Sequence, residues 1–227
     1  MDRRPTASAP RVRRSRAEQK RETRDALVLA ALEAFTRDGY HGASLEGIAG
    51  EAGFSKGAVY SNFGGKAELF LAVMDHNLEA LRGDDWDPFA PPEPSGDGDD
   101  GAAELVRGFG LATLEFIATA VRDATLVDAL RVRIRVLLDA YGRVAAAGRP
   151  AGESLPAGDV AQLMAALDQG ASVLALSGVA SVEGALLRTG LRRLVDPAGA
   201  ADEPSPARDD RASPDVERVR RLIRGAS

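Results

Sequence analysis

Residues 44–66, SLEGIAGEAGFSKGAVYSNFGGK, decide how the N-terminal part of this chain folds. They predict a short helix, a tight turn at Gly53, and a second short helix that begins after Ser55. Ala49 is small enough for two helices to cross closely, and Gly53 can adopt the positive φ angle that a sharp turn between helices requires. Val59 is expected to point from the second helix into a shared core. This arrangement is typical of a helix-turn-helix, whose second helix is presented to the major groove of DNA.

The second of these helices combines a small buried face with an unusual polar face. The buried side is expected to pack with the apolar residues around the turn, which are Leu45, Ile48, Ala52, Phe54 and Phe63. Ser55 is a favourable N-cap because its hydroxyl can accept a hydrogen bond from a backbone N–H. Gly57 lowers helix propensity by about 1 kcal/mol relative to Ala. On so short a helix, this cost suggests that another molecule comes close to the backbone.

The polar face carries no acidic group that would repel a phosphate backbone. Lys66 stands in the first turn of the following helix, where a cation is unfavourable to the helix dipole and a phosphate would compensate. Residues able to donate hydrogen bonds, reach phosphates or allow close approach therefore form the predicted DNA-binding set, which is Ser44, Ser55, Lys56, Gly57, Tyr60, Ser61, Asn62 and Lys66.

Residues 21–74 resemble the DNA-binding domain of the TetR (tetracycline-repressor-like) family of transcriptional regulators. The resemblance is carried by residues 31–70, ALEAFTRDGYHGASLEGIAGEAGFSKGAVYSNFGGKAELF, which follow the family pattern F-x-x-x-G-[YF]-x-x-x-[ST]-x-x-x-I-A-x-x-A-G-[VF]-S-K-G-x-[LV]-Y-x-x-F-x-x-K-x-x-L-F almost completely. One departure is Gly64-Gly65, where the family more often has Pro, Lys, Ser or Asn. It falls in the turn after the second helix and leaves the groove-facing residues intact.

Charge is distributed unevenly along the 227 residues, whose overall net charge is −5. Residues 1–70 carry 12 Lys and Arg against 9 Asp and Glu, and residues 71–227 carry 17 against 25. Binding to nucleic acid favours the positive part, whereas an acidic remainder suits a soluble effector domain. The chain has no cysteine, no run approaching the ~18 apolar residues of a membrane span, and no apolar core behind its Arg-rich start. We therefore expect a cytoplasmic protein without disulfides.

The apolar spacing predicts an all-α fold with an N-terminal helix-turn-helix domain. The resemblance implies that the C-terminal helices form a ligand-binding and dimerisation domain. Residues 1–14 are expected to be a disordered basic arm, whose Arg11, Arg13 and Arg14 either contact DNA or are only solvated. The other expected divisions are a helix-turn-helix domain at 15–66, a connecting helix at 67–82, an acidic Pro/Gly-rich linker at 83–101, an effector-binding and dimerisation domain at 102–196, and a flexible tail with a short basic helix at 197–227.

Helix ends are predicted from capping residues. Ser15 and Glu18 have the spacing of a capping box, and Gly39 is expected to stop the first helix. Residues 104–121 are apolar on nearly every side, which predicts a buried central helix. Residues 130–136 alternate like a strand, yet their flanks favour a helix over 125–147. Asp159 with Gln162 is expected to cap the next helix, which ends near residue 178, and Ser181 to begin the last one.

Two sets of C-terminal residues are candidates for binding. Small residues on the last two large helices allow close helix approach, which serves packing within the chain or between copies. The resemblance implies the second, with a four-helix dimer interface that includes Ala171, Ala175, Gly184 and Leu187. Aromatic residues that could line an effector pocket include Phe109, Phe116 and Tyr141, although core packing is the commoner role for any single one of them.

No catalytic set and no metal site can be assembled from the sequence. His41 and His76 are far apart and no cysteine is present, so we expect neither a metal nor a cofactor. The resemblance implies a regulator, most simply a repressor, that binds a palindromic operator as a homodimer and is released by an unknown small-molecule effector. A non-specific architectural DNA-binding protein, a TetR-type activator without ligand control, and an enzyme fused to a helix-turn-helix stay open as alternatives.

Overall fold

The computed structural model describes residues 15–83, 86–90 and 100–199, and every regular element among them is helical, as predicted. The elements are α1 (Arg16–Gly42), α2 (Leu45–Glu51), α3 (Lys56–Asn62), α4 (Lys66–Leu78), the 3₁₀ helix η1 (Glu79–Arg82), α5 (Asp100–Ala120), α6 (Ala124–Gly148), α7 (Ala157–Ser177) and α8 (Gly184–Val195). The predicted basic arm and the predicted basic helix near the C-terminus lie outside the described residues.

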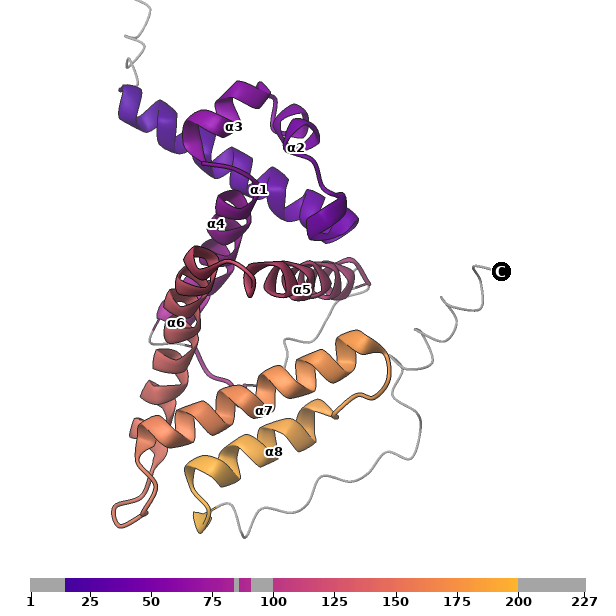
Figure 1. Ribbon diagram of the computed structural model, residues 1–227. Coiled ribbons are helices and arrows are strands. Elements are labelled where there is room, and N and C mark those ends of the chain that lie inside the picture. Colours follow the sequence, from indigo (N-terminus) through magenta and orange to yellow (C-terminus); the bar gives the residue numbers. More distant parts are fainter. Residues whose placement is uncertain (1–14, 84–85, 91–99, 200–227) are drawn as a thin grey trace, which may run out of the picture.

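The helices form an N-terminal head and a C-terminal helical body (Figure 1). In the head (residues 15–78), α1 runs beside α2 and α3, and α4 leads from them toward α6; α5 lies between α1 and the α7–α8 pair. α6 packs against both α4 and α7. This order places the predicted DNA-binding helices at one end of the molecule and the predicted dimerisation helices at the other.

Two hydrophobic clusters hold the fold together. The larger joins α1, α2, α3, α4 and α5, and its centre is a group of fully or nearly fully buried rings: Phe35, Tyr40, Phe70 and Phe116. Phe70 lies 4.7 Å from the ring of Phe116 and 4.9 Å from that of Phe35. The smaller cluster joins α6, α7 and α8 around Tyr141 and Met164. Burial of large rings at these spacings makes the first cluster the main source of stability in the head.

The start of α1 follows the predicted signal, whereas the helix ends three residues beyond the predicted stop at Gly39. The Ser15 hydroxyl accepts a hydrogen bond from the backbone N–H of Glu18 (3.1 Å), and the Glu18 carboxylate accepts one from the N–H of Ser15 (2.6 Å). This backbone hydrogen bond, more than the hydroxyl, lowers the pKa of Glu18. Gly39 interrupts the regular helix with φ +73°, and a last helical stretch continues to Gly42. The capping-box prediction is confirmed.

Other predicted helix ends are wrong by a few residues. α7 begins at Ala157 after Pro156, with no side-chain cap, so Asp159 lies inside the first turn and does not cap it. α8 begins at Gly184 rather than Ser181. α5 begins at Asp100, inside the segment expected to be linker, and the connecting helix turns into η1 at Glu79. α7 and α8 both begin without a side-chain cap, and at α7 the ring of Pro156 fixes the φ of the N-cap residue.

Two burial predictions and the prediction that no segment approaches a membrane span are also corrected. Phe54 is 37% exposed and does not share the core of the head. α5 is buried along one face only, through residues such as Ala112 and Phe116, while Val106 is 73% exposed. α7 is long and apolar enough to cross a membrane by length and composition alone, and 28% of its most apolar 18-residue stretch is buried in the structure. Asp168 and other polar residues divide its apolar run, which is why no unbroken apolar stretch marks it in the sequence.

Candidate nucleic-acid interface

The turn between α2 and α3 has the backbone geometry that the sequence predicted. Gly53 adopts φ +75°, a left-handed conformation that residues with a side chain rarely adopt. Two backbone hydrogen bonds close the turn, one from Gly53 N–H to the Gly50 carbonyl at 3.1 Å and one from Phe54 N–H to the Ala49 carbonyl at 2.8 Å. The Ser55 hydroxyl then accepts the N–H of Ala58 at 3.3 Å and so caps α3.

The inner face of α3 is anchored in the core of the head. Val59 is fully buried and Phe63, the residue that ends the helix, is 1% exposed. They meet Ile48 and Ala49 of α2, which are also buried. A seven-residue helix is too short to be stable alone, so this packing is what holds α3 in shape.

A residue that sequence analysis missed, Arg24 of α1, holds the far end of α3. Its guanidinium donates to the carbonyl of Asn62 at 2.7 Å and stands 4.2 Å from the centre of the Phe63 ring. A cation at a helix C-terminus satisfies an unpaired carbonyl and complements the helix dipole. The two residues are 38 positions apart in sequence, so no local pattern could have paired them.

The outer face of α3 is open. Lys56, Gly57 and Ser61 are exposed, and Tyr60 is 55% exposed despite its aromatic ring. Lys56 Nζ lies 3.7 Å from a carboxylate oxygen of Glu46, and both side chains are exposed. Exposed ion pairs of this kind contribute little, so Lys56 can exchange its partner for a phosphate. A Cβ added at Gly57 would meet only the Ser55 hydroxyl, at 3.6 Å, so packing within the protein does not require glycine there.

Three other members of the predicted set have partners within the chain. The Ser44 hydroxyl caps α2 by accepting the N–H of Gly47 at 3.0 Å. Asn62 donates to the Ala58 carbonyl at 2.8 Å, and its amide oxygen is buried without a partner. The Lys66 ammonium donates to the carbonyl of His41 at 2.9 Å, and burial lowers its pKa. These contacts give Ser44, Asn62 and Lys66 a structural role, while their DNA contacts stay predictions.

The three aromatic residues predicted for an effector pocket do not come together. Phe109 stacks on Phe70 at 5.4 Å and Phe116 is fully buried beside it, so both belong to the larger cluster. Tyr141 lies in the smaller cluster, edge-on to Trp86 at 4.9 Å. Burial is the main cause that raises the pKa of Tyr141, and the charge of Asp168 and a hydrogen bond with it add to the effect. In this structure all three serve core packing.

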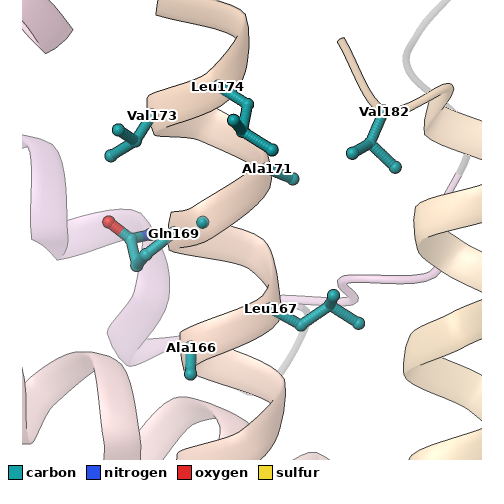
Figure 2. A pocket seen from close by; sticks show the side chains of 8 residues that line it. Ala166, Leu167, Gln169, Ala171, Val173, Leu174 and Val182 are labelled. Carbon is teal, nitrogen blue, oxygen red and sulfur yellow. The ribbon is translucent and has the colours of Figure 1, made fainter. Parts of the chain in front are cut away.

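The predicted dimer residues lie on or beside an exposed apolar face of α7. An open groove of about 590 Å³ runs along this helix and is closed on one side by Val182 (Figure 2). Leu167, Ala171 and Leu174 point toward Val182 across the groove. Ala175 and Gly184 are exposed, whereas Ala171 is only 7% exposed and Leu187 packs against the smaller cluster. Within the described residues, no group of three or more His, Cys, Asp or Glu side chains is placed to hold a metal ion.

Comparison with known sequences assigns this head to a family. Residues 27–73 match the model of the bacterial regulatory proteins, tetR family. The chain is 43% identical over 60 residues to the transcriptional activator FasR of Mycolicibacterium smegmatis, which covers 26% of this chain and 27% of FasR. It is 31% identical over 124 residues to the transcriptional regulator CymR of Pseudomonas putida, which covers 52% of this chain and 61% of CymR. The matched part thus spans less than two thirds of these relatives.

Solved structures resemble the whole described fold. A protein described as a TetR-family transcriptional regulator, from Mesorhizobium loti, superposes with a TM-score of 0.53 at 20% identity and covers 80% of this chain and 96% of its own. GusR of Salmonella enterica superposes with a TM-score of 0.52 at 21% identity and covers 77% and 95%. At these identities the likeness establishes the fold.

Proposed function

Because residues 27–73 match the tetR family of bacterial regulatory proteins, we propose that the chain is a transcriptional regulator of this family that binds a palindromic DNA operator as a homodimer. In this proposal it acts as a repressor in the cytoplasm, and a small-molecule effector releases it from DNA. The related regulators include both an activator and a repressor by name.

The observation that carries the proposal is the outer face of α3. The helix is anchored on its inner face and at both ends, yet its outer face carries an exposed lysine, an exposed tyrosine and an uncrowded glycine. Hydrogen-bonding and cationic side chains on a rigid, exposed helix of a helix-turn-helix suit both phosphate contacts and base contacts in a major groove.

The homodimer is supported by the apolar face of α7. Leu163, Leu167, Val173 and Leu174 are between 39% and 46% exposed, which is unusual for so apolar a helix in a soluble domain. A second copy of α7 and α8 would cover this face and place two α3 helices on one duplex. Two half-sites about one helical turn apart, ~34–36 Å, are the spacing that such a dimer reads.

Control by an effector is supported by how α5 is packed. α5 contacts α1 of the head and α7 of the body, so a ligand that displaces it would move the head. Such a ligand shifts the equilibrium only by its differential affinity for the DNA-binding and released states.

The proposal is tested by selecting duplexes from a random pool with the purified full-length chain. We expect an inverted repeat to be enriched and to bind at least about 10³-fold more tightly than random duplex. Tyr60→Ala is the variant to compare with the wild-type chain, because Tyr60 is exposed and the loss of its side chain should not unfold the head.

Each outcome of the selection has a distinct meaning. Enrichment of an inverted repeat that Tyr60→Ala binds more weakly supports the regulator. Tight binding without enrichment of any sequence would instead support an architectural DNA-binding protein, and no binding would contradict both proposals.

A further inference from the structure

A cluster of polar contacts surrounds the end of α1. Gly39 is the point at which α1 departs from regular helical geometry, and Tyr40 and His41 follow it, a few residues before the cap of α2. α5 of the helical body contacts this segment from one side and α4 from another. We call the contacts made by Glu115 and Lys66 with residues 39–41 the α1 clasp.

Glu115 of α5 forms the first half of the α1 clasp. One of its carboxylate oxygens accepts the backbone N–H of His41 at 3.0 Å. The carboxylate fills the space above Gly39, where an added Cβ would stand 2.8 Å from Glu115 Oε1. One turn further along α5, the Thr119 hydroxyl lies 3.3 Å from His41 Nε2. A charged acceptor thus reaches from α5 to a backbone donor at the kink of α1, and charge-assisted hydrogen bonds are the stronger kind.

Lys66 of α4 forms the second half. Its ammonium donates to the carbonyl of His41 and stands 5.0 Å from the centre of the Tyr40 ring. The two charged groups therefore hold the N–H and the carbonyl of the same residue. Burial lowers the pKa of Lys66, and the negative charge of Glu115 partly offsets this by favouring the charged form.

The segment that is held leads directly into the helix-turn-helix. Ala43 is buried, its N–H returns to the Gly39 carbonyl at 3.3 Å, and Ser44 caps α2. Two turns before Glu115, α5 approaches α1 so closely that a Cβ on Gly108 would lie 2.3 Å from the carbonyl oxygen of Thr36. α5 therefore touches α1 at a tight backbone approach and at the polar clasp, and the clasp is nearer to α2 along the chain.

We propose that Glu115 is a positioning residue for DNA binding, which with Lys66 clasps residues 39–41 and so fixes the helix-turn-helix relative to α5. The proposal rests on the proposed function for its DNA readout, but the clasp itself is testable without DNA. Glu115 itself touches no DNA and acts through the orientation of α2 and α3.

The DNA-independent experiment measures a distance between spin labels. The chain has no cysteine, so Gly50→Cys on α2 and Arg135→Cys on α6 provide unique labelling sites, and both positions are exposed. Labelled chain is mixed with excess unlabelled chain, so that only the distance between the two labels within one copy is measured. We expect one narrow distribution in the labelled parent and a broader or shifted one after Glu115→Met, which keeps side-chain length and removes the acceptor. Glu104→Met is the matched control, an exposed glutamate on the same helix.

A second variant and a rescue complete the distance experiment. Lys66→Met should broaden the distribution in the same way, and it serves if Glu115→Met does not fold. Glu115→Gln keeps an acceptor for the His41 N–H and should restore part of the narrow distribution. Unchanged distributions in Glu115→Met and Lys66→Met would overturn the proposal, as would an equal change in Glu104→Met.

The DNA experiment uses a duplex selected by the wild-type protein. Glu115→Met is expected to bind this duplex about 3- to 30-fold more weakly than Glu104→Met, the range of mutations that act through coupling. Equal affinity of the two variants would refute the positioning role. If the wild-type protein selects no duplex, the proposed function fails, whereas the distance experiment still decides whether the α1 clasp exists.

Discussion

The head (residues 15–78) and the α7–α8 pair bury their apolar side chains in different ways. In the head, the rings of Phe35 and Phe70 are fully buried, together with Phe116 of α5, within one chain. Along α7, leucine and valine side chains stay 39% to 46% exposed on one face. The head is therefore completed by side chains of its own chain, whereas α7 and α8 present a surface that another chain can complete.

The largest expected effect contrasts a core ring with an exposed leucine. Phe70→Ala should lower the free energy of unfolding by about 3–5 kcal/mol, because it leaves a cavity among the surrounding rings. Leu174→Ala, at 42% exposure, should cost less than about 1 kcal/mol in dilute protein. Urea unfolding measures both. Similar decreases for the two variants in dilute protein would show that α7 is buried within the single chain, and would contradict the contrast between the head and α7.

Replacing a small residue on the exposed face should separate the two copies. Ala175→Arg or Gly184→Arg puts a charge into the proposed interface, which leaves an unpaired charge buried if the dimer forms. We expect a monomer by light scattering and loss of operator binding, with the helical content unchanged. Ala118→Arg, at an exposed site on α5, is the matched control. A dimer that persists in both α7–α8 variants would show that the dimer interface lies on other residues.

Two glycines in the head should respond in opposite directions to alanine. Gly57→Ala is expected to raise the free energy of unfolding by up to about 1 kcal/mol, because no atom of the described protein crowds the site, and to weaken DNA binding. Gly53→Ala should lower stability by about 1–2 kcal/mol because of its positive φ. Thermal unfolding and binding assays separate the effects. Unchanged DNA affinity in Gly57→Ala would show that DNA does not approach this backbone.

The smallest effect is expected from the basic arm. Deleting residues 1–14 should leave the dimer folded and weaken operator and random duplex by similar factors. Each phosphate that the arm neutralises contributes roughly 0.9 to the slope of log K against log salt. Binding isotherms at several salt concentrations check this. If the slope does not change, Arg11, Arg13 and Arg14 make no contact with DNA.

The sequence was sufficient where local backbone chemistry decides the structure. Gly53, Ser55 and the Ser15–Glu18 capping box act over a few residues, and all three were predicted. Interactions between distant residues were not predictable in this way. The Arg24–Asn62 hydrogen bond and the separation of Tyr141 from Phe109 depend on tertiary packing, which no local spacing encodes.

The errors concentrate in the C-terminal half for a physical reason. The starts of α7 and α8 were placed at polar residues, yet neither helix begins with a side-chain cap, and Pro156 is the N-cap residue of α7. The exposed faces of α5 and α7 are also apolar, so hydrophobicity alone could not separate core from surface. In a single sequence, an apolar surface that binds another molecule has the same composition as the buried core and cannot be distinguished from it.

The most direct test of the central claim, that α3 binds DNA through its outer face, is the salt dependence of Lys56→Ala. Binding of the selected duplex is measured at several salt concentrations for this variant, for wild type and for Arg135→Ala, an exposed cation on α6. In Lys56→Ala we expect the slope of log K against log salt to fall by about 0.9 for each phosphate that Lys56 neutralises in the wild-type complex. In Arg135→Ala the slope should stay at its wild-type value. An unchanged slope in Lys56→Ala, or an equal fall in Arg135→Ala, would contradict the claim.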